Sequence, residues 1–586
     1  MQLRLVSGLL ALAAVSSCTA VSAPTDGYPV GVMSVAGADD DTLVIPIAPP
    51  GLPGPLPTPI GPPPPSPPPT PSSVELPRVT VDTRYPTITG RSIAVHAGGD
   101  LQAAINSANR GDEIVIDAGA TFLGAYQLPE KGGTARDGWI VIRTSALASL
   151  PPEGTRVTPQ HAAAMPKLLA PNASQSVFAT AANARGYRLV GLEIGAATTV
   201  SQLGALVRFG DGTAAQNDLT RVPSDLILDR SYVHGHALLN LQRCVTLNSA
   251  ASAIIDSYLS ECHGKGFDSQ AILGWNGPGP FKIENNYLEG AGENVMFGGS
   301  DPNIPNLIPS DIEIRRNHFY KPPAWKGLWT VKNLLELKLG SRVLVEGNVF
   351  ENCWVDGGTG FAINFKSVNQ GGRAPWSSTS DVTFRYNAVR NAAAGITLAA
   401  QPETNPAVPM RRVLVAHNVF ENVGEFNLTS NGRMIVLQGG LNDVTLTHNT
   451  MMHGLFSGSG QFILMDLGRD QPGSNLTVTN NISTWGGPFG AVMGRGPQGQ
   501  QALASYSTAY AFDRNVVIGL PRNLVAGYPV NNFYPALATE VGFVDLATGD
   551  YRLATWSPHR GSSTTSTDPG ADITTLRQRI SGVVIP

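Results

Sequence analysis

The sequence predicts an all-β fold, a solenoid of stacked coils made of short strands, and three observations predict it. Runs of alternating apolar and polar residues that end in Asn and one more apolar residue recur between residues 286 and 515. The 586-residue chain contains 64 Gly and 46 Pro but only 14% charged residues, which is typical of turn-rich β proteins. A short helical segment precedes the repeats, at the end of the stack that needs a cover.

The repeats share one asparagine at a fixed place in the pattern. These residues are Asn286, Asn317, Asn348, Asn387, Asn418, Asn449, Asn481 and Asn515. The intervals between them are 31, 31, 39, 31, 31, 32 and 34 residues, and Ser231 and Ser257 fit the same place in two copies upstream. Each coil should bury its apolar side chains and stack on the next at about 4.8 Å. Asn at such a corner tolerates a left-handed backbone, and its amide can bond to the Asn above and below. We therefore interpret these asparagines as structural.

The cover for the first coil is expected from residues 99–116. Residues 99–108 (GDLQAAINSA) form an amphipathic pattern with Asp100 in the capping position. A strand is expected over residues 113–116 (EIVI), after the turn Gly111-Asp112. This helix followed by a strand closes the open apolar end of the solenoid.

The N-terminus is expected to be an export signal over residues 1–23. Arg4 precedes an apolar stretch, residues 5–15, that is too short to span a bilayer. Ala23 would end an ordinary small-residue cleavage site, whereas residues 15–18 (VSSC) resemble a bacterial lipobox in which Cys18 is lipidated. The two destinations left open are a lipoprotein of the bacterial cell envelope and a freely secreted protein. Membrane attachment is expected only through a lipid on Cys18.

The segment from residue 24 to residue 78 is expected to be a disordered, proline-rich linker. Between residues 46 and 71, 15 of 26 residues are Pro. Such a run favours extended polyproline II and would reach about 80 Å at ~3.1 Å per residue. We expect the solenoid domain over residues 79–560 and a C-terminal tail over residues 561–586.

Charge and cysteine content exclude some classes of protein. A formal charge of −4 and a pI near 6.2 argue against a nucleic-acid binder. Separately, we expect the protein to be a monomer. Apart from Cys18, the cysteines are Cys244, Cys262 and Cys353, an odd number without metal-binding spacing. A Cys244–Cys262 bridge is compatible with an oxidising compartment, but the sequence favours buried free thiols.

The capping segment and the repeated Asn coils carry a resemblance. The stretch GDLQAAINSANRGDEIVIDAG and the coils of the type LVEGNVFEN resemble the pectate-lyase-like superfamily, from about residue 93 to about residue 553. The resemblance implies a single-stranded right-handed parallel β-helix with an N-terminal capping helix. That architecture includes lyases, hydrolases, epimerases, tailspikes and adhesins, so the fold does not choose an activity.

One coil carries charged residues where the others carry smaller or neutral ones. In residues 334–339 (LLELKL) the alternation places Leu334, Glu336 and Lys338 outward. In the next coil, residues 361–366 (FAINFK), it places Ala362, Asn364 and Lys366 outward. If the registers match, Glu336 stacks on Asn364, and Lys338 stacks on Lys366.

This constellation predicts a β-elimination site. Two stacked lysines repel, and a neutral lysine can act as a general base, so Lys338 is the candidate base. Lys366 or Arg373 would neutralise the charge that develops next to a uronate carboxylate. Oxygen donors for a Ca²⁺ ion are expected from Glu336, Glu293 and Asn294. The competing interpretation is a solvated Glu336–Lys338 pair that only keeps the sheet face soluble.

The strand NLLELKLGSRVLVEGNVFEN also resembles, over roughly 20 residues, a segment of the chondroitinase B and alginate lyase family. In that family a Glu precedes a catalytic Lys before a corner of this kind. The resemblance implies that Lys338 is the base and Glu336 a metal ligand. The family's arginine on the next coil has no match here, because Lys366 stands at that place.

Long loops beside these coils carry aromatic residues. Trp325, Trp329 and Trp376 lie on them, and with Asn364 and Gln401 they are candidates for binding sugar rings. Plugs at the base of the loops are the alternative interpretation of the tryptophans.

The sequence thus predicts an exported protein that acts on an extracellular polysaccharide, with a lyase of acidic glycans as the sharper hypothesis. A non-catalytic glycan-binding or structural surface protein is the alternative. A glycoside hydrolase is the second alternative, and it would need Glu336 to pair with Asp301 or Glu293 across a groove.

Overall fold

The structure is a computed structural model that describes residues 73–402, 404–425, 428, 432–454, 460–468, 470–485, 487 and 490–584. The predicted export signal, the lipidation site at Cys18 and nearly all of the proline-rich linker lie outside the described residues. What is described belongs to one compact unit, Pro64–Pro586.

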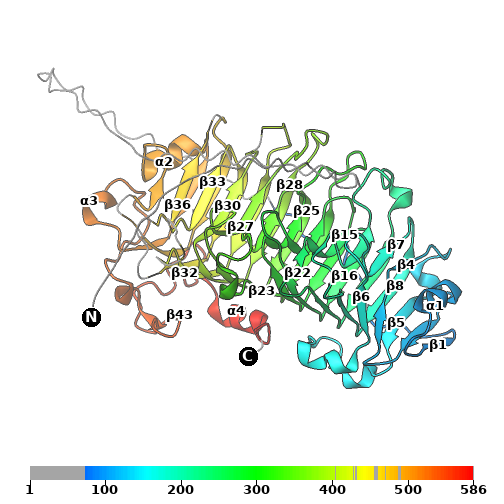
Figure 1. Ribbon diagram of the computed structural model, residues 1–586. Helices are drawn as coiled ribbons and strands as arrows, with labels where there is room; N and C mark the ends of the chain where they lie inside the picture. Colours follow the sequence, from blue (N-terminus) through cyan, green and yellow to red (C-terminus); the bar gives the residue numbers. More distant parts are fainter. Residues whose placement is uncertain are drawn as a thin grey trace, which may run out of the picture. The chain divides into compact units, whose positions relative to one another are not determined.

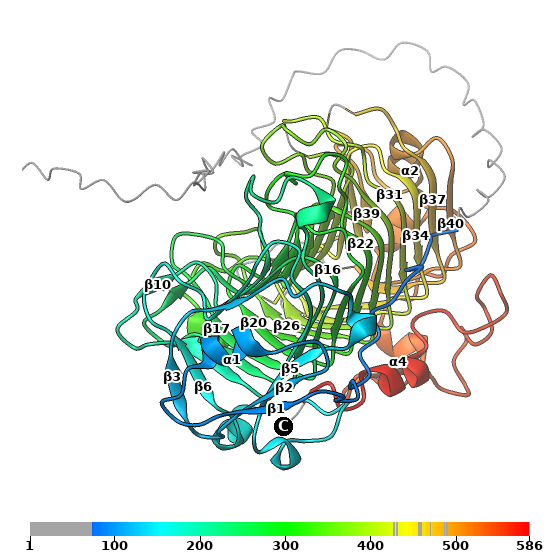
Figure 2. The ribbon, with the colours of Figure 1, turned by 90° about the vertical axis from the view of Figure 1, so that its right-hand side faces the viewer.

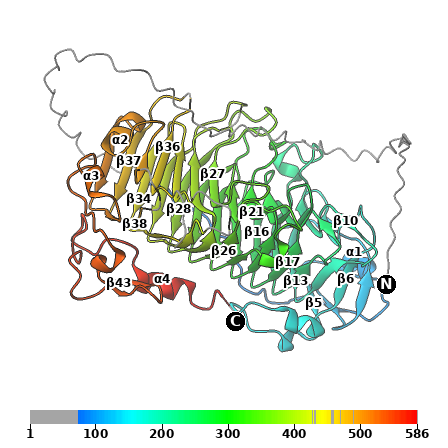
Figure 3. The same ribbon diagram turned by 60° about the vertical axis from the view of Figure 1, so that its left-hand side comes forward.

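That unit is a right-handed parallel β-helix (Figures 1 and 3). Over the described residues, its strands form three long sheets of 14, 13 and 12 strands, here called sheets A, B and C. Each coil contributes one strand to A, then to B, then to C, and neighbouring coils pair in parallel, as in β22, β23 and β24 with β25, β26 and β27. The right-handed path is the favoured sense for parallel crossover connections. This confirms the predicted fold class.

Sheet A consists of β1 (Ser92–Val95), β2 (Glu113–Ile116), β5 (Ile140–Thr144), β8 (Arg185–Val190), β12 (Ser224–Asp229), β16 (Ala250–Ile255), β19 (Phe281–Glu284), β22 (Ser310–Arg315), β25 (Gly340–Glu346), β28 (Thr379–Arg385), β31 (Arg411–Ala416), β34 (Asn442–Thr447), β37 (Ser474–Thr479) and β40 (Tyr510–Asp513). Sheet B consists of β3 (Thr121–Leu123), β6 (Lys167–Ala170), β9 (Glu193–Ala196), β13 (Tyr232–His234), β17 (Tyr258–Cys262), β20 (Tyr287–Gly290), β23 (His318–Tyr320), β26 (Val349–Cys353), β29 (Ala388–Ala392), β32 (Val419–Val423), β35 (Thr450–His453), β38 (Ile482–Thr484) and β41 (Val516–Ile518).

Sheet C consists of β4 (Tyr126–Leu128), β7 (Phe178–Thr180), β11 (Val207–Gly210), β15 (Arg243–Asn248), β18 (Gln270–Gly274), β21 (Glu293–Phe297), β24 (Leu335–Leu337), β27 (Phe361–Lys366), β30 (Ala394–Ala399), β33 (Ile435–Gln438), β36 (Ile463–Asp466) and β39 (Val492–Met493). Two small pairs lie outside these sheets, β10 (Gln202–Leu203) with β14 (Asn240–Leu241) and β42 (Phe543–Asp545) with β43 (Asp550–Leu553). The α-helices are α1 (Leu101–Ser107), α2 (Gln500–Tyr506), α3 (Arg522–Val525) and α4 (Ile573–Ile580). None of the helices in this part of the chain is both long and apolar enough to cross a membrane.

Helix α1 covers the first coil, as the sequence predicts (Figure 2). The Asp100 side chain accepts a hydrogen bond from the Ala103 N–H at 2.9 Å, which caps the helix. Leu101, Ala104 and Ile105 are buried against the open end of the apolar core. The strand expected after it is β2, with the predicted bounds.

The repeated asparagines form a continuous ladder at the corner between sheets A and B. From Asn286 to Asn515, each side-chain N–H donates to the Oδ1 of the Asn one coil further on, at 2.9 to 3.1 Å, and Asn532 extends the ladder. The same Oδ1 also accepts the backbone N–H of the preceding Asn, for example Asn348 N–H to Asn387 Oδ1 at 3.0 Å. The predicted structural role is confirmed.

One detail of that prediction is wrong, because the left-handed residue is the one before each ladder Asn. Asn285, Arg316 and His417 have φ of 57°, 54° and 56°. The ladder Asn itself stays buried, so its amide can reach both neighbours, while the residue before it turns outward. The corner therefore presents one outward side chain per coil. These side chains, from the residue before each ladder Asn, form a second column, here called the corner column.

Cys244 and Cys262 form a disulfide, which corrects the expectation of free thiols. They lie 18 residues apart, on β15 and at the end of β17, and the corner between sheets B and C brings their Cα atoms to 5.7 Å. Linear spacing does not reveal this, because the two strands belong to different sheets. Cys353 is a buried free cysteine.

Reducing this disulfide should lower the free energy of unfolding by about 3 kcal/mol, since it closes a loop of 18 residues in the unfolded chain. Urea denaturation with and without a thiol reductant measures the change. The reductant should lower the stability of the Cys353→Ser variant as much as that of the wild type. It should not change the stability of a Cys244→Ser/Cys262→Ser variant. Equal stability of the oxidised and reduced wild type would contradict the prediction.

The chain enters the domain along the outer face of sheet A, through residues 73–90, here called the strap. The Glu75 N–H donates to Asp381 Oδ1 at 3.3 Å on β28, and the Arg78 N–H donates to Asp311 Oδ1 at 2.8 Å on β22. Further along, the buried Arg188 of β8 donates to the carbonyls of Thr83 and Arg84, both at 2.9 Å. The strap therefore crosses many coils before β1 starts the solenoid.

The C-terminal residues also pack on the solenoid, through residues 563–584, here called the arm. Thr564 and Asn480 exchange two hydrogen bonds at 2.8 and 2.9 Å. Val583 is fully buried with Val349 and Ala388. Figures 1 and 3 show α4 alongside the coils rather than beyond their end. The described part of the expected tail is thus docked on the corner column.

Two histidines of that column contact the arm. His417 accepts the Asp572 N–H at Nδ1 (3.3 Å), and Thr567 Oγ1 lies 3.5 Å from His448 Nε2. The two rings stack at 5.0 Å, and His417 also stacks on Tyr386. Burial lowers the pKa of His417, and burial together with His417 lowers the pKa of His448 to about 4.

Because these pKa values are lower in the folded state than in the unfolded chain, the unfolded state takes up protons first as the pH falls. Stability is therefore fully present above about pH 6.5 and should be lost progressively towards pH 4. The melting temperature, followed with hydrogen exchange of residues 563–584, tests this. The His448→Gln variant should lose less stability than the wild type, and the exposed His96→Gln should behave like the wild type. An identical loss in His448→Gln would refute the assignment.

Candidate functional site

The charged residues predicted on one coil lie on the outer face of sheet C. Strand β24 pairs with β27 so that Glu336 faces Asn364, as the predicted register requires. Leu335 and Leu337 point into the apolar core on the opposite face. Lys338 directly follows β24, and Lys366 ends β27, so both lysines lie on the same outer face as Glu336.

The predicted alternation fails at the start of each strand. Leu334 and Ala362, expected outside, are fully buried in the core. The Asn294 and Val295 N–H groups both donate to the Leu334 carbonyl, at 3.1 and 3.3 Å. This shared acceptor marks a bend where the chain leaves the corner, and the strict alternation of sides begins only after it.

Glu336 holds the centre of the cluster. Its Oε1 accepts the Asn364 Nδ2–H at 3.1 Å, and it lies 3.4 Å from Lys366 Nζ and 4.0 Å from Lys338 Nζ. Lys338 Nζ also donates to Gln370 Oε1 at 3.2 Å. A carboxylate between the two ammonium groups offsets the repulsion expected from stacked lysines.

A second carboxyl group lies beside it. Glu293 is fully buried, and its Oε2 accepts the Gln270 Nε2–H at 2.7 Å. Burial, with the nearby charges of Asp268 and Glu336, raises the pKa of Glu293 to about 8. Burial therefore favours the protonated form of this group, and its other oxygen, Oε1, has no hydrogen-bond partner in the described part of the chain.

Glu336 behaves in the opposite way. Burial alone would raise its pKa, but the charges of Lys338, Lys366 and Lys332 outweigh burial and lower it. The site thus holds two neighbouring carboxyl groups whose pKa values are shifted in opposite directions, a pattern characteristic of acid–base sites.

Residues that the sequence reasoning missed support this pair. Lys321 is fully buried, and its Nζ donates to the carbonyls of Gly290, Ala291 and Gly292 at 2.5, 2.9 and 3.0 Å. These carbonyls belong to the turn that leads directly into Glu293. Gln270 was also missed, although β18 pairs it with Glu293, so stacking the coils in register one step further back would have found it. Nothing in the sequence around Lys321 signals its role.

Of the predicted Ca²⁺ ligands, Glu336 and Glu293 lie near each other, but Asn294 is turned away from them. Asn294 follows Glu293 and faces the other side, where its amide donates to the carbonyls of Leu288 and Tyr320 at 2.6 and 2.9 Å. Two lysines occupy the outer side of Glu336, and Glu293 holds a proton. Among the described residues, no three or more His, Cys, Asp or Glu side chains gather in a way that would hold a metal. This donor set does not fit Ca²⁺.

Arg373 lies on the loop that borders the cluster. Asp301, 2% exposed, accepts the N–H groups of Gly371 and Arg373 at 2.9 to 3.0 Å and so fixes this loop. The Arg373 side chain is exposed, with Nε 3.8 Å from Asp301 Oδ2. Gln370 of the same loop contacts Lys338. The loop therefore places the Arg373 guanidinium near the lysines, and the Arg373 side chain remains largely exposed to solvent.

The predicted aromatic residues divide into two groups. Trp325 is 5% exposed and packs with Ala291, Val331 and Trp354, so it plugs a loop base, which is the alternative interpretation given above. Trp329 and Trp376 are half-buried. Trp329 stacks on His263 at 3.8 Å, and Trp376 Nε1–H donates to the Leu307 carbonyl at 3.1 Å. Gln401 Oε1 accepts the Ala407 N–H at 3.2 Å and stabilises its own loop.

Comparison with known proteins gives likenesses of fold. No family model matches the sequence, and no curated protein matches it. The chain resembles a solved mannuronic acid-specific polysaccharide family 6 lyase from human gut microbiota, with 11% identity and a TM-score of 0.46 over 76% of this chain and 91% of that one. It also resembles XylC solved with xylose (10%, 0.41, 76% and 86%) and pectate lyase Pel9A (9%, 0.30, 82% and 96%).

Proposed function

We propose that the cluster on sheet C cleaves an acidic polysaccharide by β-elimination. The observation that carries the proposal is the ionised Glu336 held between Lys338 and Lys366, with the protonated Glu293 beneath it. Positive charge gathered on one outer face favours an anionic, uronate-containing chain. Lys366, with its side chain 15% exposed, is the most accessible member, so substrate would approach from its side.

In this proposal each residue has one task. Lys366 and Arg373 would bind the substrate carboxylate and stabilise the negative charge that develops when the adjacent carbon loses its proton. Lys338 would take that proton. The electron pair forms the new double bond, the glycosidic C–O bond breaks, and the leaving oxygen takes a proton from solvent. Glu336 would hold both lysines in place. No step needs a metal.

The geometry disfavours a glycoside hydrolase. Glycosidases hold two carboxyl groups about 5 to 10 Å apart, with the sugar between them. Glu293 is fully buried, so its carboxyl group cannot reach a sugar on the outer face. Asp301 is committed to the backbone of the loop around Gly371.

We also propose that the protein is exported, to the bacterial cell envelope or the medium. The predicted signal over residues 1–23 supports this, with lipidation at Cys18 as the form that would anchor it. The disulfide between Cys244 and Cys262 fits an oxidising compartment. Mass spectrometry of the mature N-terminus distinguishes a lipid on Cys18 from cleavage after Ala23.

The direct test is incubation of the purified chain with alginate, pectate, chondroitin and hyaluronan, with the ultraviolet absorbance of unsaturated uronate as the readout. Appearance of unsaturated product on one of these polymers is the expected result. Retention on glycan affinity gels without any product would instead identify a binding module.

The raised pKa of Glu293 predicts that the stability of the protein depends on pH, and this can be measured without substrate. Since its pKa is raised to about 8 in the folded state, stability is fully present below its ordinary value of 4.5 and is lost as the pH rises through 8. The melting temperature of the wild type should therefore fall between about pH 5 and pH 8, and that of Glu293→Gln should fall less. Parallel melting curves for the two proteins would contradict the assignment.

A further inference from the structure

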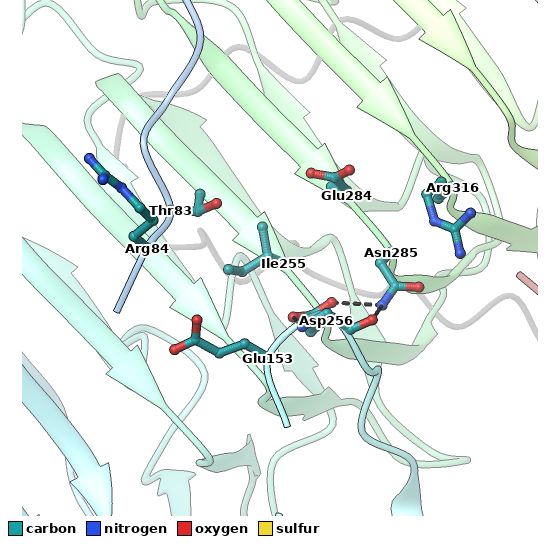
Figure 4. Close-up of a pocket in the computed structure, with 9 residues that line it drawn as sticks. Thr83, Arg84, Glu153, Ile255, Asp256, Glu284, Asn285 and Arg316 are labelled. Atoms are coloured by element: carbon teal, nitrogen blue, oxygen red, sulfur yellow. Dashed lines mark hydrogen bonds between the residues drawn. The ribbon is translucent and has the colours of Figure 1, made fainter. Parts of the chain in front are cut away.

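A cavity of about 270 Å³ lies at the corner between sheets A and B, across the solenoid from sheet C. Figure 4 shows its lining. The lining residues are Thr83, Arg84, Glu153, Gly154, Ile255, Asp256, Glu284, Asn285 and Arg316. Its volume is just below the range of roughly 300 to 1,000 Å³ typical of small-molecule sites, so it suits a ligand of one or two sugar rings.

The cavity floor comes from the corner column. Asp256, Asn285 and Arg316 are successive outward residues of that column, each with a left-handed backbone. Asp256 is 4% exposed, and its carboxyl accepts the Asn285 Nδ2–H at 2.6 Å and the Gly154 N–H at 2.7 Å. Both donors are neutral. Figure 4 shows this carboxyl and the Asn285 amide at the centre of the lining.

The cavity walls come from two segments that are not part of the coils, and a third segment lies at its edge. The strap contributes Thr83 and Arg84, and the loop over residues 151–157 contributes Glu153. The arm reaches the edge, where Arg316 donates to the carbonyls of Arg579 and Ser581 at 3.0 and 2.9 Å. Arg156, 3% exposed, joins the loop to the arm by donating to the carbonyls of Asn285 and Val583 at 3.1 and 2.7 Å.

The chemistry of the lining selects the ligand class. The lining contains three carboxyl groups and two guanidinium groups, and one of these guanidinium groups, that of Arg84, is paired with Asp82. Hydroxyl groups match such a lining, because each can donate to a carboxylate and accept from a guanidinium. Ile255 adds an apolar surface for the C–H face of a ring. A polyanion would meet the carboxyl groups of Asp256 and Glu153, in contrast to the lysine-lined cluster on sheet C.

We propose that this cavity binds a neutral sugar unit, at a site separate from the cluster on sheet C. Such a site would hold the protein on a neutral glycan while the other face acts on an acidic one. The strap, the loop over residues 151–157 and the arm also meet around this cavity. A bound sugar should therefore make these segments detach from the solenoid less often. The proposal does not depend on lyase activity.

The test is calorimetric titration of the full chain with glucose, galactose, mannose, N-acetylglucosamine and neutral disaccharides, with galacturonate as the charged comparison. We expect binding of at least one neutral sugar, and weaker binding of galacturonate. Glu153→Gln and Arg84→Ala alter the rim and should each weaken binding about tenfold, the effect of one lost hydrogen bond to a charged group. Glu130→Gln and Arg136→Ala, exposed residues elsewhere, are the matched controls and should bind like the wild type.

Hydrogen exchange gives an independent readout, because bound sugar should slow exchange in residues 151–157 and 579–584. Lys338→Ala should bind the neutral sugar unchanged, which separates this site from the proposed lyase site. The proposal is overturned if no neutral sugar binds, if galacturonate binds more tightly than every neutral sugar, or if the rim variants bind like their controls.

Discussion

Replacing Asn387 by alanine is expected to lower the free energy of unfolding by about 4 kcal/mol or more. Its Nδ2 donates to Asn418 Oδ1 and to the Val345 carbonyl, both at 3.0 Å. Its Oδ1 accepts the backbone and side-chain N–H groups of Asn348, both at 3.0 Å. Alanine would leave several fully buried polar groups without partners, and each such group costs about 1 to 3 kcal/mol.

The midpoint of urea denaturation measures this change. Asn172→Ala is the matched control, because Asn172 is exposed and bonds only to Gln175 and Ser174 nearby in the chain. The control should stay within about 0.5 kcal/mol of the wild type. A loss below 1 kcal/mol in Asn387→Ala would show that the coils do not depend on the ladder.

The second large effect is expected on catalysis. If Lys338 is the base, Lys338→Ala should lower the rate of unsaturated-product formation by about 10² to 10⁴-fold, the usual contribution of a positioned acid or base. Stability should change much less, because Glu336 keeps Lys366 and Asn364 as partners. Steady-state kinetics on whichever acidic glycan is cleaved gives the measurement.

Two comparisons make this result specific. Lys265→Ala removes an exposed lysine elsewhere on the surface and should leave the rate unchanged. Lys366→Ala should raise KM as well as lower kcat, because Lys366 is assigned to the substrate carboxylate. If the Lys338→Ala variant keeps wild-type activity, Lys338 is not the base, and Glu336 becomes the next candidate.

Much of the site was predictable because side chains on stacked coils follow the register of their strands. The pairing of Glu336 with Asn364 follows from the alternation in LLELKL and FAINFK, and the structure confirms it. The corner residues broke this rule. Leu334 and Ala362 turn inward, because the backbone bends where it leaves the corner.

Other features needed the three-dimensional path of the chain. The Cys244–Cys262 bridge joins strands of different sheets, and Lys321 acts through three backbone carbonyls whose positions no sequence pattern records. The raised pKa of Glu293 depends on complete burial and on the nearby charges of Asp268 and Glu336. The cavity at Asp256 depends on the strap, the loop over residues 151–157 and the arm, which are far apart in sequence.

The sequence alone determined the repeating unit of this protein. The period of about 31 residues, the corner Asn and the alternation of apolar residues specify one coil, and identical coils can only stack, because each leaves its main-chain N–H and C=O groups to be paired by the next. Only the tertiary structure decided which charges are buried together and where the strap and the arm dock. Those outcomes depend on desolvation and on contacts between segments hundreds of residues apart, and neither leaves a periodic trace in the sequence.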